Sequence, residues 1–593
     1  MPPHADPGAD PAEEPALAYL ATQVDPSIVT GAHVAETEWL RALVRHGQFR
    51  RLSIHAAGTA AQRAALAAPL GADPRVEVVA ARELPARVAE RAPDVFQLPY
   101  LFASQIAYLR ERFAAHPFPI TGLVHAIADA DTKPLLARNL AFASHDMDVA
   151  ICPSRHVRTA LLSISEEIQV EQGAAVPRAL PRTALIPLGI DTERFRAGDS
   201  QALRAANGIA PDAILLGYVG RLSPWTKADL LPLLVAFQRL CAAVPAQPLM
   251  LLIVGEEQAE GYAALLMAAA QSLGIAERVA IWTGVPRGQV VDIYRMSDIF
   301  VSPADNLQET FGLTLIEAMA CGVPVVASAW NGYREIVEDG ATGFLVPTYA
   351  AAADPAVVDA ALFHGYRTTA AHAAQTTALD LRVLVDRLAS LVVAPDLRRR
   401  LGERAAEVAR ARYDWKVVIA AHQELWREER RRGASRARTT GYQPYRTDTT
   451  RHFRHYASGS LDAETRLRRQ AGAECLPASV LGSLARMASV DWPLACRLLD
   501  RLAREPGASV AALQGRGSRD RDPPRDALPA QARSGRDRRA RDLNAASPGR
   551  AVAAEIIAPA RRHNYSEKQF RWLQRGRASR DDLVRIGGMP WHR

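Results

Sequence analysis

The stretch that decides the fold is VSPADNLQETFGLTLIEAMACGVPVVASAWNGYREIVEDGATGFLVP, residues 301–347. It begins with the end of an apolar strand at Val301-Ser302, continues through a polar loop, and enters a helix near Phe311-Gly312. Thr310 is expected to cap this helix, and the good helix formers that follow run from Leu313 to Ala320. Ligands of parallel α/β sheets bind beyond the carboxyl ends of the strands, so this loop is predicted to line a binding site.

The first turn of this helix suits an anion. Its free backbone N–H groups carry partial positive charge, and Gly312 would let a diphosphate approach the backbone closely. Glu309 precedes the turn, and Glu317 lies inside the helix, roughly 6 Å along its axis from Leu313. A carboxylate repels a diphosphate, so Glu309 is predicted to bind a sugar hydroxyl and Glu317 a ribose hydroxyl. The plain alternatives are an exposed loop acid and a helix acid paired with an arginine.

Apolar strands alternate with helix-length segments throughout the first 350 residues. One set comprises ALAYLAT at 16–22, RLSIHAAG at 51–58, VEVVAA at 76–81, ITGLVHAIA at 120–128 and MDVAICPS at 147–154. The other comprises AILLGYVGRL at 213–222, LMLLIVGEE at 249–257, VAIWTGV at 279–285, DIFVSPA at 298–304, VPVVASA at 323–329 and GFLVP at 343–347. This rhythm is typical of parallel α/β sheets, and it predicts two similar domains in series.

Four parts of the chain are predicted from these patterns. They are a disordered start at 1–14, an N-terminal Rossmann-like domain at 15–196, a C-terminal Rossmann-like domain with closing helices at 197–432, and an Arg-rich extension at 433–593. The length of 593 residues also exceeds the ~250 to 300 residues that one hydrophobic core serves. The extension has little apolar periodicity and is expected to be mostly disordered, with short helices within 480–503 and 566–588.

The net charge of +8 is concentrated in one part of the chain. Residues 1–432 carry 41 Lys and Arg against 48 Asp and Glu, whereas residues 433–593 carry 31 against 16. The five cysteines are far apart and include no C-x-x-C pair, which is typical of buried thiols in a reducing compartment. No 18-residue apolar run and no secretory leader pattern occur, so a cytoplasmic location is expected, with peripheral contact at the inner membrane face left open.

The segment ETFGLTLIE, residues 309–317, resembles the E-x7-E signature of family 4 (group 1) retaining glycosyltransferases of the GT-B fold. In GYVGRLSPWTKADLL, the pair Arg221 and Lys227 is similar to the basic pair that holds the donor diphosphate in that family. The resemblance implies an α/β protein in which two Rossmann-like domains have parallel sheets that face a central cleft. Cations beside the diphosphate would stabilise the charge that it gains as the glycosidic bond breaks.

Further site residues follow from the same resemblance. His125 sits where family members carry a histidine that faces the donor sugar, so His125 and Glu309 are the expected catalytic residues. A structural histidine is the alternative. The expected donor-binding residues are Arg221, Lys227, Gly284, Val285, Thr310, Phe311, Gly312, Leu313 and Glu317. The chain departs from the family near its first strand, where Gly31 alone stands in place of the glycine-rich loop that contacts phosphate or acceptor.

The resemblance implies transfer of a sugar from a nucleotide diphosphate sugar to a glycan or lipid-linked acceptor, with retention of anomeric configuration. Neither a metal nor another cofactor is expected. The donor is expected to bind against residues 197–395, and the acceptor is expected to approach from residues 1–196. The sequence identifies neither the nucleotide, the sugar, the acceptor nor the linkage.

Three other interpretations remain. Asp129 and Asp131 form a D-x-D that would bind a metal in a GT-A enzyme, but this motif is short and common. A nicotinamide dehydrogenase shares the fold type, yet GYVGRLS lacks the third glycine of G-x-G-x-x-G. The basic extension could bind nucleic acid or an anionic membrane. Its arginines alternate with aspartates and lack interleaved aromatics, which disfavours nucleic acid.

Overall fold

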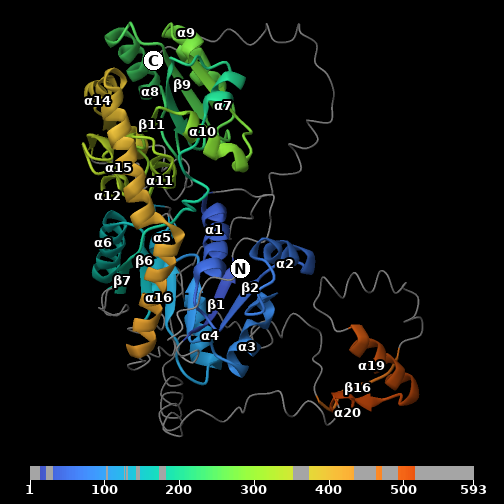
Figure 1. The fold of residues 1–593 in the computed structure, drawn as a ribbon. Coiled ribbons are helices and arrows are strands. Elements are labelled where there is room, and N and C mark those ends of the chain that lie inside the picture. Colours follow the sequence, from blue (N-terminus) through green and yellow to red (C-terminus); the bar gives the residue numbers. More distant parts are fainter. Residues whose placement is uncertain are drawn as a thin grey trace, which may run out of the picture. The chain divides into compact units, whose positions relative to one another are not determined.

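The computed structural model describes residues 14–21, 31–101, 104–125, 127–128, 131–141, 147–172, 182–351, 373–432, 463–469 and 492–514. The chain divides into two compact units, Met1–Asp448 and Thr449–Arg593. The first unit contains both large sheets (Figure 1). Among the described residues, no helix is long and apolar enough to cross a membrane.

The first sheet has seven strands in the order β3-β2-β1-β4-β5-β6-β7, and all neighbours are parallel. The strands are β1 (Ala16–Ala21), β2 (Arg51–Ala56), β3 (Val76–Ala80), β4 (Val95–Leu98), β5 (Ile120–Leu123), β6 (Val149–Cys152) and β7 (Arg182–Leu185). The connecting helices are α1 (Gly31–His46), α2 (Ala60–Ala67), α3 (Leu84–Glu90), α4 (Ser104–Phe113), α5 (Thr132–Ala141) and α6 (Arg155–Gln172). Tyr19 and Ala18 belong to different apolar clusters, because successive strand residues face opposite helix layers.

The second sheet has six parallel strands in the order β10-β9-β8-β11-β12-β13. They are β8 (Ile214–Val219), β9 (Leu249–Val254), β10 (Val279–Trp282), β11 (Ile299–Ser302), β12 (Val325–Ser328) and β13 (Gly343–Val346). The helices between them are α8 (Leu231–Ala243), α9 (Tyr262–Ser272), α10 (Val290–Met296), α11 (Leu313–Ala320) and α12 (Tyr333–Ile336), and α7 (Gln201–Ala206) precedes β8. The strands β14 (Thr348–Ala350) and β15 (Thr377–Leu379) form an antiparallel pair beyond this sheet. The predicted fold class, two Rossmann-like parallel sheets, is confirmed.

Three helices close the first unit: α14 (Leu381–Val393), α15 (Pro395–Tyr413) and α16 (Trp415–Arg432). We predicted all three as part of the C-terminal domain, but the apolar face of α16 belongs to the core of the first sheet (Figure 1). Trp426 is fully buried, lies 6.3 Å from Trp39 of α1 between ring centroids, and donates its indole N–H to Thr121 Oγ1 at 3.2 Å. The predicted bounds of the two domains stay a prediction.

Two local expectations were wrong. The strand β4 was missed, because VFQL is only four residues long and places a polar Gln97 in a buried position, where Thr121 Oγ1 donates to its side-chain oxygen at 2.5 Å. The second is the cap of α11. Its N-cap residue is Gly312, with no side-chain cap hydrogen bond, so Thr310 does not cap this helix.

The second unit is described only in part. It contains α19 (Trp492–Arg504), α20 (Val510–Gln514) and a short antiparallel pair of β16 (Arg466–Leu467) with β17 (Ala508–Ser509). Helix α19 confirms part of the helix predicted within 480–503, and residues 480–491 lie outside the described residues. Of the start expected to be disordered at 1–14, only residue 14 is described, and most of the extension at 433–593, including the helix expected within 566–588, lies outside the described residues.

Candidate functional site

The loop between β11 and α11 brings two of the predicted residues into direct contact. Lys227 Nζ donates to Glu309 Oε2, and their side chains are only 14% and 12% exposed. Lys227 follows β8 and Glu309 follows β11, which are neighbours in the sheet. The ion pair therefore forms at the carboxyl ends of two adjacent parallel strands, where ligands of such sheets bind.

Tyr333, which was not predicted from the sequence, forms a hydrogen bond with Glu309. Its hydroxyl lies 2.8 Å from Ser302 Oγ and donates to Glu309 Oε2 at 3.3 Å. The side chain is fully buried, and burial raises the pKa of the Tyr333 hydroxyl well above its ordinary value. The hydroxyl therefore stays protonated and acts as a hydrogen-bond donor to Glu309.

The ring of Tyr333 also explains Gly312. A Cβ at Gly312 would lie 2.6 Å from this ring, and the φ of +125° is one that other residues rarely adopt. We expected Gly312 to allow close approach of a ligand. The structure adds a separate requirement, because only glycine fits between Tyr333 and the start of α11.

Arg221, the partner of Lys227 in the predicted basic pair, is held by its own loop. Its guanidinium donates to Gln258 Oε1 at 3.2 Å and to the Thr226 carbonyl at 3.2 Å. Thus both cations follow β8, but in this structure only Lys227 contacts Glu309.

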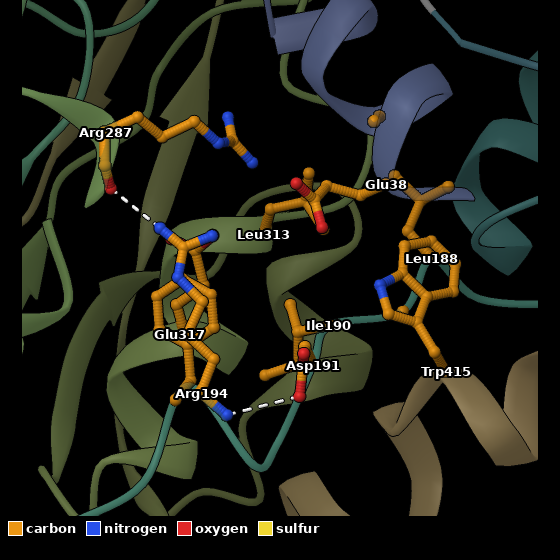
Figure 2. Close-up of a pocket in the computed structure, with 12 residues that line it drawn as sticks. Glu38, Leu188, Ile190, Asp191, Arg194, Arg287, Leu313, Glu317 and Trp415 are labelled. Atoms are coloured by element: carbon orange, nitrogen blue, oxygen red, sulfur yellow. Dashed lines mark hydrogen bonds between the residues drawn. The ribbon is translucent and has the colours of Figure 1, made fainter. Parts of the chain in front are cut away.

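Glu317 lies in a different environment, a narrow pocket between the two sheets (Figure 2). Tyr294 Oη donates to Glu317 Oε2 at 2.6 Å, and burial raises the pKa of the Glu317 carboxyl. Arg194 and Arg287 lie in the same pocket, and Arg194 Nη2 donates to the Arg287 carbonyl at 2.8 Å. Among the described residues neither arginine forms an ion pair with Glu317, so the alternative of an arginine-paired acid is not observed.

The pocket collects residues from distant parts of the first unit. The residues that line it are Ala35, Glu38, Leu188, Gly189, Ile190, Asp191, Arg194, Phe195, Arg287, Leu313, Glu317 and Trp415. The predicted donor-binding residue Leu313 is therefore beside Glu317, and Glu38 of α1 reaches the pocket from the first sheet's side (Figure 2). Two arginines near one desolvated carboxyl give this pocket groups for hydroxyls and for an anion.

His125 lies just beyond β5, where it is half-buried. Burial lowers the pKa of His125, and its ring is hydrogen-bonded to the backbone of Pro99. The adjacent strand β6 leads to Ser154, whose hydroxyl donates to the Thr310 carbonyl at 3.2 Å. The topology thus places His125 on the edge of the first sheet that faces the Glu309 loop.

The other predicted residues have less specific positions. Gly284 and Val285 follow β10, and a Cβ at Gly284 would meet open space, although its φ is +70°. Phe311 is buried against the ring of Tyr413, 5.8 Å away between centroids, so its side chain belongs to the core and only its backbone is left for a ligand. Gly31 is the first residue of α1.

The D-x-D motif lies only partly within the described residues. Asp129 of the D-x-D lies outside the described residues, while Asp131 is exposed before α5. Across the described ranges, no group of three or more His, Cys, Asp or Glu side chains is arranged to hold a metal ion.

Four residues of the site were not predicted: Arg194, Arg287, Tyr294 and Tyr333. Arginine is so abundant in this chain that a single one carries no signal, and the two tyrosines resemble ordinary core residues of short helices. A weak signal existed for Tyr333, because it follows an Asn-Gly turn at the end of a buried strand.

The chain is similar to known glycosyltransferases in sequence and in fold. Residues 199–362 match the model of the glycosyl transferases group 1. The D-inositol 3-phosphate glycosyltransferase of Actinosynnema mirum is 30% identical over 357 residues, which cover 57% of this chain and 74% of the relative. That of Mycobacterium sp. (strain JLS) is 33% identical over 262 residues, 43% of this chain and 55% of the relative. The chain spans about half the length of several of the curated relatives that it matches.

A solved structure is similar in fold. The glycosyltransferase from Rickettsia africae ESF-5 superposes with a TM-score of 0.51 and 14% sequence identity, over 70% of this chain and 98% of that one. At this identity the likeness concerns the fold alone. It covers a stretch long enough to include both parallel sheets.

Proposed function

The chain belongs to the family 4 (group 1) glycosyltransferases of the GT-B fold, and on that premise we propose that it transfers a sugar from a nucleotide diphosphate sugar to an acceptor with retention of anomeric configuration. The observation that carries the proposal is the Lys227–Glu309 pair at the start of α11. In this pair, Lys227 is a cation that can bind the diphosphate, and Glu309 is a carboxylate beside it that can bind the sugar.

The diphosphate would bind at the N-terminus of α11. Free N–H groups of its first turn, the Lys227 ammonium and the nearby Arg221 guanidinium all favour a negative charge there. Lys227 has three N–H donors, so it can keep its contact with Glu309 while it binds a phosphate oxygen. As the glycosidic bond breaks, the diphosphate gains charge, and these fixed groups stabilise that charge.

Glu309 would hold the transferred sugar. Its Oε2 accepts from Lys227 and Tyr333, which leaves Oε1 for a sugar hydroxyl. Glu317 would bind the ribose in a similar manner, because Tyr294 donates to its Oε2 and Oε1 remains an acceptor. In this arrangement both acids act as hydroxyl anchors.

No side chain is assigned as a nucleophile. We propose that the acceptor attacks from the face that the diphosphate leaves, and that a phosphate oxygen takes the acceptor proton. His125 would face the donor sugar from the first sheet and contribute a ring nitrogen, since its lowered pKa keeps the imidazole neutral. Independence from a metal belongs to the same proposal.

The acceptor is proposed to be a glycan or a lipid-linked sugar that approaches from residues 1–196. The relatives' name adds D-inositol 3-phosphate to the acceptors worth testing. A cytoplasmic location, with peripheral contact at the inner membrane face, stays a prediction, as does binding of nucleic acid or anionic membrane by the basic extension.

Thermal unfolding of the full chain tests the proposal. UDP, GDP, ADP and dTDP sugars would be added singly, and one nucleotide class is expected to raise the unfolding temperature. A donor at 100 times its Kd stabilises the folded state by about 2.7 kcal/mol. The anomeric configuration of the product, read by NMR, then tests retention. The proposal fails if no donor stabilises the protein and none is hydrolysed.

A further inference from the structure

A second, wider pocket lies beside the Glu309 loop. Its lining residues are His156, Ala329, Trp330, Asn331, Arg334, Pro347 and Thr348. Its cavity volume is about 530 Å³, which falls within the range of ~300 to 1,000 Å³ that small-molecule sites occupy. None of the functions proposed above uses it.

The side chains of this pocket suit a sugar ring. Trp330 is half-buried, and its indole N–H donates to the Asn306 carbonyl at 2.9 Å, so the ring is held in place as a stacking surface. Asn331 Oδ1 accepts from Ser154 Oγ at 3.3 Å, which leaves the amide N–H groups as donors. The Thr348 hydroxyl donates to the Ala329 carbonyl at 3.1 Å and keeps its lone pairs for a ligand hydroxyl.

The charges of the pocket favour an anion. The acid beside it, Glu335, does not line the pocket and is already engaged: its Oε1 accepts from the Arg155 backbone N–H at 2.7 Å and lies 3.0 Å from His156 Nδ1. Arg334 is exposed, and among the described residues its guanidinium forms no ion pair or side-chain hydrogen bond. The Arg334 guanidinium thus offers the pocket a fork of N–H donors, the arrangement that binds carboxylate or phosphate.

The pocket is connected to the candidate donor site. Ser154 Oγ lies within hydrogen-bond distance of both the Thr310 carbonyl, at 3.2 Å, and Asn331 Oδ1, at 3.3 Å, so the same hydroxyl contacts the donor loop and the wall of the pocket. Asn306, which accepts from Trp330, belongs to the loop that carries Glu309. A ligand in this pocket would therefore lie next to a sugar held by Glu309.

We propose that this pocket is a subsite for an acidic saccharide, in which Trp330 stacks on a sugar ring and Arg334 binds its carboxylate or phosphate. As an acceptor subsite, the assignment rests on the glycosyltransferase function proposed above. The acceptor would then carry a negative charge close to the hydroxyl that receives the new sugar. The bound acid would lie beside α12, the helix that carries Arg334.

Titration calorimetry on the full chain tests the proposal without a donor. The probes are digalacturonate and its neutral dimethyl ester, which differ in charge and little in size, and maltose 6′-phosphate with maltose. An acidic probe is expected to bind about tenfold more tightly than its neutral twin. Tighter binding of digalacturonate would identify a carboxylate as the ligand group, and tighter binding of the phosphorylated sugar a phosphate. Equal affinity of both acidic probes and their neutral twins overturns the proposal.

Two variants locate the binding. Arg334→Gln should remove the tenfold preference for the acidic probe, whereas Arg382→Gln, which removes the same charge from an exposed position on α14, should keep it. Trp330→Ala should weaken both twins, and Trp330→Phe should restore most of the binding because it keeps an aromatic face. Preserved preference in Arg334→Gln overturns the proposal. Stabilisation by nucleotide sugars is measured in a separate experiment. A failure of the proposed subsite can therefore be distinguished from a failure of the proposed glycosyltransferase function.

Discussion

Glu309, in the loop before α11, and Glu317, inside that helix, have different surroundings although they are only eight residues apart. Glu309 is neutralised by Lys227 and receives a second hydrogen bond from Tyr333. Glu317 has a tyrosine donor but no ion-pair partner among the described residues, and burial raises the pKa of its carboxyl. The comparison shows how one loop and helix can hold two acids for separate tasks, one tied to the charge of a leaving diphosphate and the other desolvated in a pocket.

The largest effect is expected from Glu309→Gln. The change removes the negative charge beside the reacting sugar, so transfer should fall about a thousandfold, while nucleotide affinity changes little. Steady-state kinetics and nucleotide titration measure the two quantities. Glu277→Gln, an exposed acid next to β10, is the matched control. Normal turnover in Glu309→Gln would contradict the role given to this acid.

Glu317→Gln should act on binding instead. Loss of a charged acceptor for a ribose hydroxyl should weaken nucleotide affinity about tenfold, with a smaller change in turnover at saturating donor. Calorimetry with the nucleotide alone checks this. If Glu317→Gln lowered turnover as strongly as Glu309→Gln, the distinction between the two acids would be wrong.

The tyrosines allow a gentler test of the same difference. Tyr333→Phe removes the donor to Glu309 and should reduce kcat about tenfold, whereas Tyr294→Phe removes the donor to Glu317 and should raise the nucleotide Kd about threefold. Both changes keep the ring, so Tyr333→Phe leaves the contact with Gly312 in place. Equal effects of the two variants on the same parameter would contradict the separate roles given to Glu309 and Glu317.

The smallest effect concerns pH. Because burial raises the pKa of Glu317, the folded chain binds this proton more readily than the unfolded chain does. The contribution of Glu317 to stability should therefore fall as pH rises from its ordinary range near ~4.3 to the raised value, and level off above it. Thermal unfolding of wild type and Glu317→Gln between pH 4 and 8 measures the difference, which should grow in favour of the variant. A difference independent of pH would show that Glu317 is not desolvated.

The sequence predicted the second sheet better than the first. All six strands of the second sheet coincide with apolar runs, because strands covered on both faces leave a continuous hydrophobic signal. In the first sheet, β4 escaped notice because its buried Gln97 is satisfied by a neighbouring strand rather than by a local pattern. Glu309 and Lys227 were predicted as site residues, and their contact was not, since the two residues are 82 positions apart in the chain and follow different strands.

Backbone conformation explains other differences. Thr310 was expected to cap α11, but the unusual φ of Gly312 turns the chain between Thr310 and the helix. The local sequence also does not reveal which sheet a distant helix packs against. The apolar stripe of α16 indicates an amphipathic helix without saying which core it completes.

The position of α16 has a consequence for synthesis of the chain. The first sheet is complete in strands at Leu185, yet Trp426, which covers α1, is added 241 residues later. At a synthesis rate of ~5 to 20 residues per second, roughly 10 to 50 s pass before Trp426 is made, and Trp39 lacks this packing partner during that time. The first sheet and its helices therefore cannot complete their core during synthesis until α16 is made. A chaperone that binds exposed aromatic surface could bind the nascent chain in that interval.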